Sequence, residues 1–237
     1  ALYAMKQLIF EEHAITWEEL LAAMHDNWQS LDSANIHKKI RHAAKFGNDE
    51  DAVDKIVKDV FDSYLKLLPS YRTQRYQQGP AVSCYTMSTS NITSYVPNGF
   101  VVGATPDGRF AGTPLNEGCS PTQGSDTSGP TAVINSVAKL PNEQVAAGQL
   151  LNMRFSPGAL AGEENLDKFV DFLIASAKKH IYHNQFNVID STTLRDAQKH
   201  PQDYTDLIVR VAGYCAQFVS LMPEAQEAII ARTENAW

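Results

Sequence analysis

The residues best suited to unusual chemistry lie in one short segment, Ile208–Ala216, which reads IVRVAGYCA. A run of mostly branched apolar residues leads into Gly213, with Arg210 three residues before the glycine and Tyr214 directly after it. Glycine has no Cβ, so its backbone can flatten or approach neighbouring groups where other residues clash. An unpaired electron on a glycine Cα is stabilised when that carbon is planar and conjugated with both flanking amides. Gly213 is therefore a candidate radical centre, to be weighed against a glycine that only forms a tight turn.

This segment resembles the glycyl radical signature of the pyruvate formate-lyase superfamily. The signature runs branched or hydroxyl residue, any residue, Arg, branched residue, small residue, Gly, Tyr, any residue, small residue, and every constrained position matches here. The resemblance favours a radical role for Gly213 over a turn role. It implies that Arg210 and Tyr214 brace the loop by hydrogen bonding and packing, with no chemistry of their own.

The resemblance extends along nearly the whole chain. It implies an α/β fold, namely the C-terminal part of a ten-stranded α/β barrel of the glycyl radical enzyme type with a helical N-terminal section. In such a barrel two finger loops meet at the centre, one carrying the glycine and the other a cysteine in a Gly-Cys-x-Glu setting. The further matching segments are, in order, Lys45–Asp49, Thr89–Asn91, Gly103–Arg109, Gly129–Leu140, Gln185–Val188 and Ile229–Thr233.

The cysteine of the second finger loop is expected outside this chain. Cys119 lies in a Gly-Cys-Ser-Pro sequence that lacks the glutamate, so it does not fit the thiyl position. Cys215, two residues after Gly213, is expected to be a small buried hydrophobe rather than a relay thiol. The opening residues Ala1–Ala4 do not look like a natural start. We therefore expect a fragment of a longer enzyme, or one chain of a split enzyme.

The resemblance also implies a mechanism with several partners. The glycyl radical takes a hydrogen atom from the cysteine, and the thiyl radical then takes one from a small-molecule substrate. A separate radical S-adenosylmethionine activating enzyme installs the radical and holds the iron–sulphur cluster, so no cofactor is expected on this chain. The remaining partners are the rest of the enzyme and a second copy in a homodimer. Activation requires the glycine loop to leave the barrel, which predicts a mobile C-terminal segment.

The branch of the superfamily is less strongly indicated. The loop Ala104–Arg109, followed by Gly112–Leu115, looks closer to the dehydratase-like branch, which implies radical cleavage of a C–O or C–N bond. Formate C-acetyltransferase and arylacetate decarboxylase remain alternatives. Tyr95 is a candidate for the substrate pocket, with a structural loop tyrosine as the alternative. Arg109 is expected to tie down its own turn rather than to bind a substrate anion.

Two hypotheses of another class stay open. Some anaerobes keep a short replacement subunit that carries only the glycyl loop and repairs an oxygen-cleaved enzyme. A catalytically inactive binding domain is the other, although the intact segment from Arg210 to Tyr214 disfavours it.

Composition excludes several other classes of function. The 237 residues carry a formal net charge of -7, and the basic residues are scattered, which argues against nucleic acid or an anionic membrane as partner. Three widely spaced cysteines predict no disulfide framework and favour the reducing cytoplasm, with a bacterial microcompartment as an alternative. His180 and His183 straddle a predicted helix end without a convincing third ligand, so no metal site is predicted.

Helices and strands that would position these residues follow from hydrophobic spacing and capping signals. Thr16 and Glu19 form a capping box for a helix over Trp17–Trp28, and a long helix carries an apolar stripe over Val53–Leu68. Acidic residues beside that stripe, Asp51, Asp54, Asp59 and Asp62, are expected to be solvated. The other predicted helices are Pro130–Leu140, Glu163–Lys179, Thr192–Lys199 and Pro223–Thr233, and the predicted strands are Val82–Met87, Leu150–Phe155, Phe186–Ile189 and Leu207–Val211. Asp190 is expected to cap the helix over Thr192–Lys199.

The alternation of strands and helices predicts parallel pairing. We divide the chain into a helical part of the pyruvate formate-lyase-like barrel domain (1–70), barrel strands with the glycine-rich loop and helices (71–180), and a glycyl radical domain (181–237). In the helix over Glu163–Lys179, the face that contains Leu166, Phe169, Val170 and Leu173 is expected to be buried.

Overall fold

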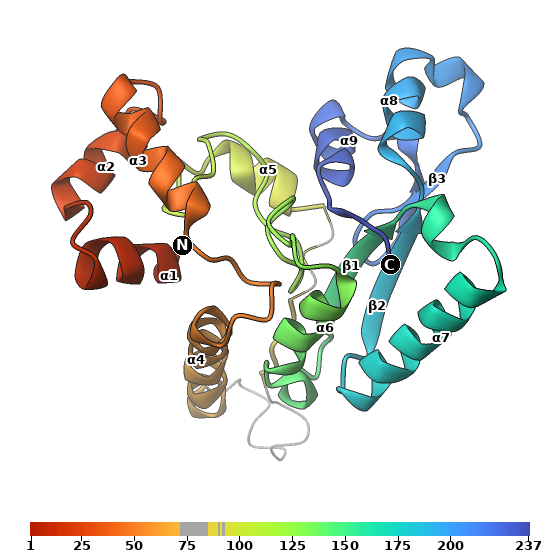
Figure 1. Ribbon diagram of the computed structural model, residues 1–237, viewed down its shortest axis with the longest axis horizontal. Helices are drawn as coiled ribbons and strands as arrows, with labels where there is room; N and C mark the ends of the chain where they lie inside the picture. Colours follow the sequence, from red (N-terminus) through yellow and green to blue (C-terminus); the bar gives the residue numbers. More distant parts are fainter. Residues whose placement is uncertain (72–84, 90, 92) are drawn as a thin grey trace.

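The computed structural model describes residues 1–71, 85–89, 91 and 93–237. Helices near the N-terminus form one side of the molecule, and a short parallel sheet with its covering helices forms the other (Figure 1). Long loops between residues 101 and 129 run between these two sides. The mixed helix and strand content with parallel pairing agrees with the predicted α/β class. The domain boundaries at 70 and 180 stay predictions.

The N-terminal section is helical, as expected. It comprises α1 (Leu2–Met5), a π-helical turn over Lys6–Glu11, α2 (Trp17–His25) and α3 (Leu31–His42). The predicted capping box is present, because the Thr16 hydroxyl accepts from the Glu19 N–H and the Glu19 carboxylate accepts from the Thr16 N–H. The helix ends at His25 rather than Trp28, since Asn27 and Trp28 adopt positive φ. The Trp28 indole then donates to the Arg109 carbonyl and joins this section to the loops.

The long helix α4 (Asp51–Leu67) confirms the predicted element, but one face was misread. Asp54 was expected in solvent and is instead completely buried. Its Oδ2 accepts hydrogen bonds from the Ser136 hydroxyl at 3.0 Å and from the Lys139 ammonium at 2.8 Å. Lys139 pairs with three carboxylates in all, so the acidic first turn of α4 serves as a docking point for α6 (Pro130–Ala138).

The central sheet has the order β2-β1-β5, and both pairings are parallel. Strand β1 (Leu150–Phe155) is buried along its whole length, which suits a strand covered on both faces. Strand β2 (His183–Val188) lies beside it with Asn152 opposite Gln185. The third strand, β5 (Glu234–Asn235), is too short to be predicted from a hydrophobic pattern.

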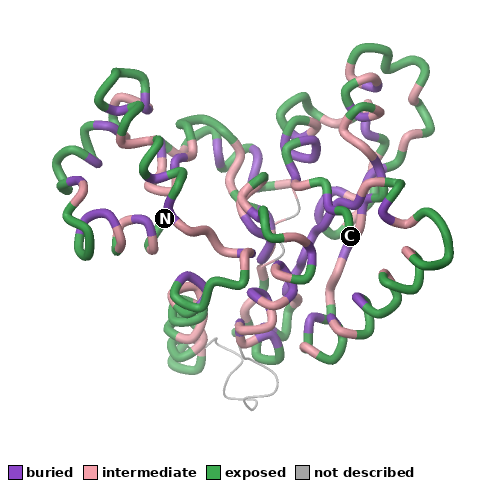
Figure 2. Tube along the Cα trace, in the orientation of Figure 1, coloured by how far each residue is buried: buried purple, intermediate pink, exposed green. Residues whose placement is uncertain are grey.

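One face of the sheet is covered by α6 and α7 (Glu163–Lys178) around an aromatic cluster. Phe155 contacts the rings of Phe169, Phe172 and Trp237, with centroids 5.5 to 5.9 Å apart. The predicted buried face of α7 is partly wrong, because Leu166, Val170 and Leu173 are exposed while Phe172 is buried. Figure 2 shows this outward side of α7 as exposed.

The last section packs a separate hydrophobic cluster above the end of the sheet. Asp190 caps α8 (Ser191–Lys199) as predicted, its carboxylate accepting from the Thr193 N–H. The predicted strand at 207–211 is present as β3 (Ile208–Arg210), and its antiparallel partner β4 (Cys215–Gln217) was not predicted. The remaining elements are α9 (Pro223–Ile230), α5 (Tyr95–Phe100) and short 3₁₀ turns at Leu68–Ser70, Asn142–Gln144, Pro157–Leu160, Pro201–Asp203 and Phe218–Ser220.

The strand predicted over Val82–Met87 is not supported where it can be judged. Its first three positions lie outside the described residues, and residues 85–87 form no strand. Helix α9 begins at Pro223 as predicted and ends at Ile230, three residues earlier than expected.

Candidate functional site

Gly213 lies at the turn of the hairpin formed by β3 and β4. The two strands pair with Ile208 opposite Gln217 and Arg210 opposite Cys215, and the Val211 N–H donates to the Tyr214 carbonyl at 2.9 Å. Within this turn Gly213 has φ of 85°, a left-handed conformation that favours glycine. The hairpin therefore presents the glycine at its tip. Gly213 is itself exposed.

The hairpin rests on an apolar floor. Val209, Val211 and Phe218 are at most 1% exposed, and Leu221 and Tyr214 pack against the same cluster at partial burial. Apolar side chains thus shield the side of the hairpin that lies below Gly213. Above the glycine, the described part of the chain leaves it open.

Two polar side chains of β2 reach the same loop. The Gln185 side-chain oxygen accepts a hydrogen bond from the Gly213 N–H at 3.0 Å. Asn187 bonds both backbone groups of Arg210, its Oδ1 accepting from the N–H at 2.7 Å and its Nδ2 donating to the carbonyl at 2.8 Å. Both side chains are buried, at 5% and 6% exposure. The hairpin is therefore hydrogen-bonded to the sheet by side chains in place of a backbone ladder.

A third side chain, Arg232 after α9, supports the loop from below. Its guanidinium donates to the carbonyls of Arg210 at 3.1 Å and Val211 at 2.7 Å, and to the Glu117 carboxylate at 2.6 Å. Both members of this ion pair are almost fully buried. Burial raises the pKa of Glu117, and the charge and hydrogen bond of Arg232 oppose that rise. Arg232 thus joins the last helix, the loop before the sheet and the hairpin.

The predicted supports Arg210 and Tyr214 both lie in this hairpin. The Arg210 guanidinium donates to the Cys215 sulphur at 3.2 Å, across the hairpin, while the Tyr214 ring packs into the cluster below. Cys215 was expected to be buried and is exposed, because β4 lies at the edge of a two-stranded pair and turns this side chain outward.

Tyr95 is the first residue of α5 and is 1% exposed. Its ring packs with Val96 against Ala225 and Ala228 of α9. Burial, followed by the charge of Glu117, raises the pKa of the Tyr95 hydroxyl to about 12. Among the described residues, none makes a hydrogen bond with the Tyr95 hydroxyl oxygen. Tyr95 therefore lies close to the Glu117–Arg232 pair, beneath the hairpin, and its contact with substrate stays a prediction.

Cys119 behaves as a structural thiol. It is 6% exposed, its sulphur donates to the Leu150 carbonyl at 3.2 Å, and burial raises its pKa to about 12. A thiol that holds its proton so strongly in an apolar setting is chemically inert.

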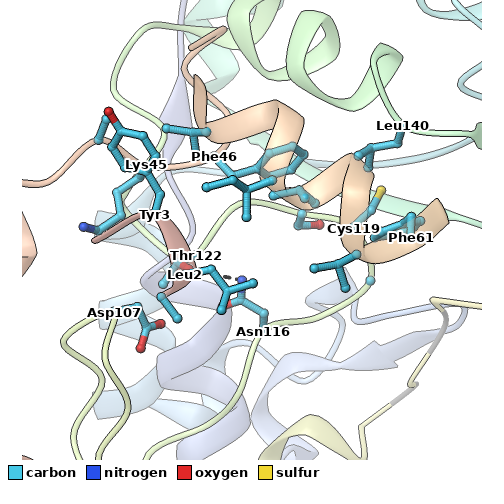
Figure 3. Close-up of a pocket in the computed structure, with 18 residues that line it drawn as sticks. Leu2, Tyr3, Lys45, Phe46, Phe61, Asp107, Asn116, Cys119, Thr122 and Leu140 are labelled. Carbon is cyan, nitrogen blue, oxygen red and sulfur yellow. Dashed lines mark hydrogen bonds between the residues drawn. The ribbon is translucent and has the colours of Figure 1, made fainter. Parts of the chain in front are cut away.

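Cys119 borders a cavity of about 390 Å³ between α1, α4 and the loops. Phe61 and Leu140 surround it on the Cys119 side, and Lys45 and Asp107 lie toward the other side of the view (Figure 3). Burial lowers the pKa of Lys45 to about 8. The residues that line this cavity come from positions 1–140, so it does not include the hairpin.

Arg109 has the role predicted for it. Its guanidinium donates to the carbonyls of Val102, Phe110 and Thr113, and so closes the turn around Gly108. No group of three potential metal ligands occurs among the described residues. In that same part of the chain, no helix has the length and apolar content needed to cross a membrane.

Gln185, Asn187 and Arg232 were not predicted as site residues. One signal was available, because His183, Gln185 and Asn187 alternate along β2 and place polar side chains on one face of a strand in a parallel sheet, where apolar residues are usual. Arg232 gave no such signal. Its contacts with residues 210, 211 and 117 depend entirely on the tertiary fold.

Comparison with known proteins gives two matching family models. The model described as "Glycine radical" matches residues 115–219, and the model described as "Pyruvate formate lyase-like" matches residues 1–99. The hairpin, β2 and Glu117 all fall within the first match.

Individual relatives match nearly the whole chain. A probable dehydratase of Escherichia coli strain K12, YbiW, is 44% identical over 99% of this chain and 29% of its own length. An indoleacetate decarboxylase of Tractidigestivibacter scatoligenes is 40% identical over 98% of this chain and 28% of its own length. A solved structure concerning 1,2-propanediol dehydration in Roseburia inulinivorans superposes with a TM-score of 0.93 and 41% identity, over 99% of this chain and 30% of that one. The chain thus spans less than a third of each relative.

Proposed function

Because this chain belongs to the glycyl radical enzyme superfamily, we propose that Gly213 is its radical-storing residue. The observation that carries the proposal is the placement of Gly213 at the tip of a buttressed hairpin. A glycine there can flatten into conjugation with its two amides, because no side chain opposes the change. The hairpin's apolar floor and its buried hydrogen bonds hold the flanking amides in place.

In this proposal the chain stores the radical and another part of the enzyme uses it. The Gly213 radical takes a hydrogen atom from a cysteine outside this chain, and the resulting thiyl radical takes one from substrate. Cys119 does not fit that role, because its buried sulphur donates to the Leu150 carbonyl and borders a cavity that does not include the hairpin. Because Gly213 is exposed here, the rest of the enzyme covers it during catalysis and keeps water away from the reacting atoms.

Installing the radical requires removal of one hydrogen atom from Gly213. We propose that a separate radical S-adenosylmethionine enzyme does this and contributes the necessary iron–sulphur chemistry. The hairpin tip suits such a step, because it projects from the fold on two short strands of three residues each. Arg210 and Tyr214 then act as supports that restore the closed geometry after activation.

For the reaction itself we propose radical elimination from a small substrate, with cleavage of a C–O or C–N bond. Two of the relatives described above concern dehydration, a probable dehydratase and a 1,2-propanediol-dehydrating enzyme, and both exceed 40% identity. Arylacetate decarboxylation, which uses the same radical chemistry, is the alternative reaction, because the indoleacetate decarboxylase is 40% identical to this chain.

Exposure of the activated protein to air tests the radical position directly. Oxygen adds to a backbone carbon radical, so we expect the chain to break at Gly213 and to yield a new C-terminal piece that begins close to Tyr214. Mass spectrometry under denaturing conditions locates the break, and protein that was never activated is the control. An activated chain that stays intact in air, or breaks elsewhere, would contradict the proposal.

A substrate panel tests the reaction class. The anaerobically activated full enzyme is incubated with 1,2-propanediol, glycerol, trans-4-hydroxy-L-proline and indoleacetate. We expect turnover of a substrate that loses water, detected as its dehydrated product by mass spectrometry. Turnover of indoleacetate with release of carbon dioxide, and of none of the others, would replace the elimination proposal with the decarboxylase alternative.

A second function is favoured by one observation. The side chains that hold the hairpin, Gln185, Asn187 and Arg232, all belong to this chain, so the radical loop is organised without further subunits. Such a chain suits a replacement subunit that repairs an oxygen-cleaved enzyme. Adding it to an air-inactivated partner enzyme, with fresh activation, distinguishes the two functions, since only a replacement subunit returns turnover.

A further inference from the structure

The Gly213 N–H makes a part-buried hydrogen bond to a residue outside the signature segment. We propose that Gln185 is a positioning residue for the radical, whose side-chain oxygen fixes the peptide plane before Gly213 and strengthens the radical's conjugation with that amide. The contact is the 3.0 Å hydrogen bond from the Gly213 N–H to the Gln185 Oε1. This proposal deepens the function proposed above and rests on it.

The position of Gln185 makes the contact rigid. Residue 185 lies within β2, paired with Asn152 of the fully buried strand β1, and its side chain is 5% exposed. A buried side chain on a paired strand loses little further freedom when it binds its partner. In a setting of low dielectric constant, the hydrogen bond is also stronger than the same bond in water.

The Gly213 N–H can only donate, so it requires the oxygen end of the Gln185 amide, and His183 faces the nitrogen end. The Gln185 Nε2 lies 2.9 Å from the His183 Nε2. An amide nitrogen can only donate, so His183 accepts at Nε2 and carries its proton on Nδ1. With the nitrogen end occupied in this way, the oxygen end of the amide is directed at the Gly213 N–H. A reversed amide would place a donor against the Gly213 N–H and an acceptor against the accepting nitrogen of His183.

The hydrogen bond has an electronic consequence for a radical at Gly213. The amide nitrogen donates electron density to the electron-poor Cα, and the carbonyl on the other side withdraws it. An acceptor on the N–H polarises that bond toward nitrogen and increases the donation. The same contact fixes the direction of the N–H, and therefore the plane with which the flattened Cα must align.

The other two buried supports hold different atoms. Asn187 bonds the backbone of Arg210, and Arg232 bonds the carbonyls of Arg210 and Val211. These contacts fix the approach of the chain to the glycine, while Gln185 alone among the three touches Gly213. A change at residue 185 therefore acts on the radical's spectrum, whereas changes at 187 or 232 act through the position of the whole loop.

The test is electron–nuclear double resonance on the anaerobically activated full enzyme carrying Gln185→Met. Methionine fills a similar volume and offers only a weak acceptor. We expect the coupling of the exchangeable N–H proton, identified by its loss in heavy water, to change from that of the wild type. We also expect the lifetime of the radical to fall about tenfold, as for loss of one buried hydrogen bond. Gln217→Met, an exposed position on β4 of the same hairpin, is the matched control and should keep both values.

A second variant guards against loss of the fold. Gln185→Glu keeps an oxygen acceptor for the N–H, so its radical should form and its N–H coupling should differ from that of the methionine variant. Radical formation in Gln185→Glu but not in Gln185→Met would support the proposal. Wild-type coupling and lifetime in both variants would overturn it, and so would loss of the radical in both, because an acceptor at 185 would then not suffice.

Two measurements separate failure of this proposal from failure of the proposed function. If Gly213→Ala keeps the radical signal, the radical lies elsewhere and the proposed function fails. Amide hydrogen exchange at Gly213 in the protein before activation tests the contact alone. We expect exchange to accelerate about tenfold in Gln185→Met and not in Gln217→Met. An unchanged exchange rate at Gly213 would show that this hydrogen bond does not protect the Gly213 N–H. The role proposed for Gln185 would then be wrong, while Gly213 would still be the proposed radical site.

Discussion

The Gly213→Ala variant is expected to show no glycine-centred doublet in electron paramagnetic resonance and no turnover after anaerobic activation. A methyl group on the α-carbon opposes the planar arrangement that conjugates the radical with its two amides. It also replaces one of the two α-hydrogens, so the characteristic doublet from the remaining hydrogen cannot arise. Both effects act at the reacting carbon, so the predicted loss of activity is complete.

The variant needs a control for backbone strain. Gly213 has φ of 85°, and an alanine in this left-handed region costs about 1–2 kcal/mol. Gly112 has φ of 75°, and a Cβ added there would meet no atom within 4 Å, so Gly112→Ala introduces similar strain away from the hairpin. We expect Gly112→Ala to keep the doublet and the turnover. A doublet that persists in Gly213→Ala would place the radical at another residue.

The Arg232→Ala variant is expected to lower the free energy of unfolding by about 3–5 kcal/mol. The substitution leaves the Glu117 carboxylate buried without its partner and removes two hydrogen bonds from the hairpin backbone. For a domain of this size, such a loss corresponds to a fall in Tm of roughly 6–20 °C. Differential scanning calorimetry measures the change.

A matched control is available in a second arginine–glutamate pair. Arg195 of α8 pairs with Glu227 of α9, but both side chains are about half exposed. Arg195→Ala should therefore lower the free energy of unfolding by less than about 1 kcal/mol. If Arg232→Ala costs no more than Arg195→Ala, the buried pair does not support the hairpin in the way we describe.

The pH dependence of the variant provides a further check. Burial already raises the pKa of Glu117, and without Arg232 the largest opposing influence on that pKa is gone and only the hydrogen bond with Asn152 still opposes the rise. A carboxyl whose folded pKa exceeds its unfolded value binds a proton more readily in the folded state, so stability is lost as pH rises toward the folded pKa. The loss of unfolding free energy caused by Arg232→Ala should therefore be smaller at pH 5 than at pH 8. Adding Glu117→Gln to this variant should restore part of the lost unfolding free energy at pH 8, because the buried charge is removed.

Local signals predicted the elements that position the site well. The capping residues Thr16 and Asp190 bond their helices as expected, and Leu150–Phe155 forms a strand with the predicted bounds. The fold class was also predicted, since the chain has the α/β fold of the C-terminal part of a glycyl radical enzyme. The predicted caps and the predicted strand share one cause, since each depends on residues close together in the sequence, whereas the fold was implied by a resemblance along nearly the whole chain.

Features that depend on distant residues were missed. Asp54 matches the pattern of a solvated helix face, and only the packing of α6 against α4 reveals its partners, Ser136 and Lys139. Strand β4 has three residues and follows the loop so closely that no period can be detected. The support of the hairpin by Gln185 and Arg232 joins positions 28 and 21 residues away in the sequence, which no local pattern encodes.

The anchoring of the last residues affects what an oxygen-damaged molecule would look like. A break at Gly213 separates residues 214–237, yet this piece remains tied to the larger one by Arg232 on Glu117, by Arg154 on the Arg232 carbonyl and by the Trp237 indole on the Ala159 carbonyl. Gel filtration or a native gel would therefore record an unchanged particle. A quality-control system in the cell would therefore have to recognise the oxygen-cleaved enzyme by a property other than its size.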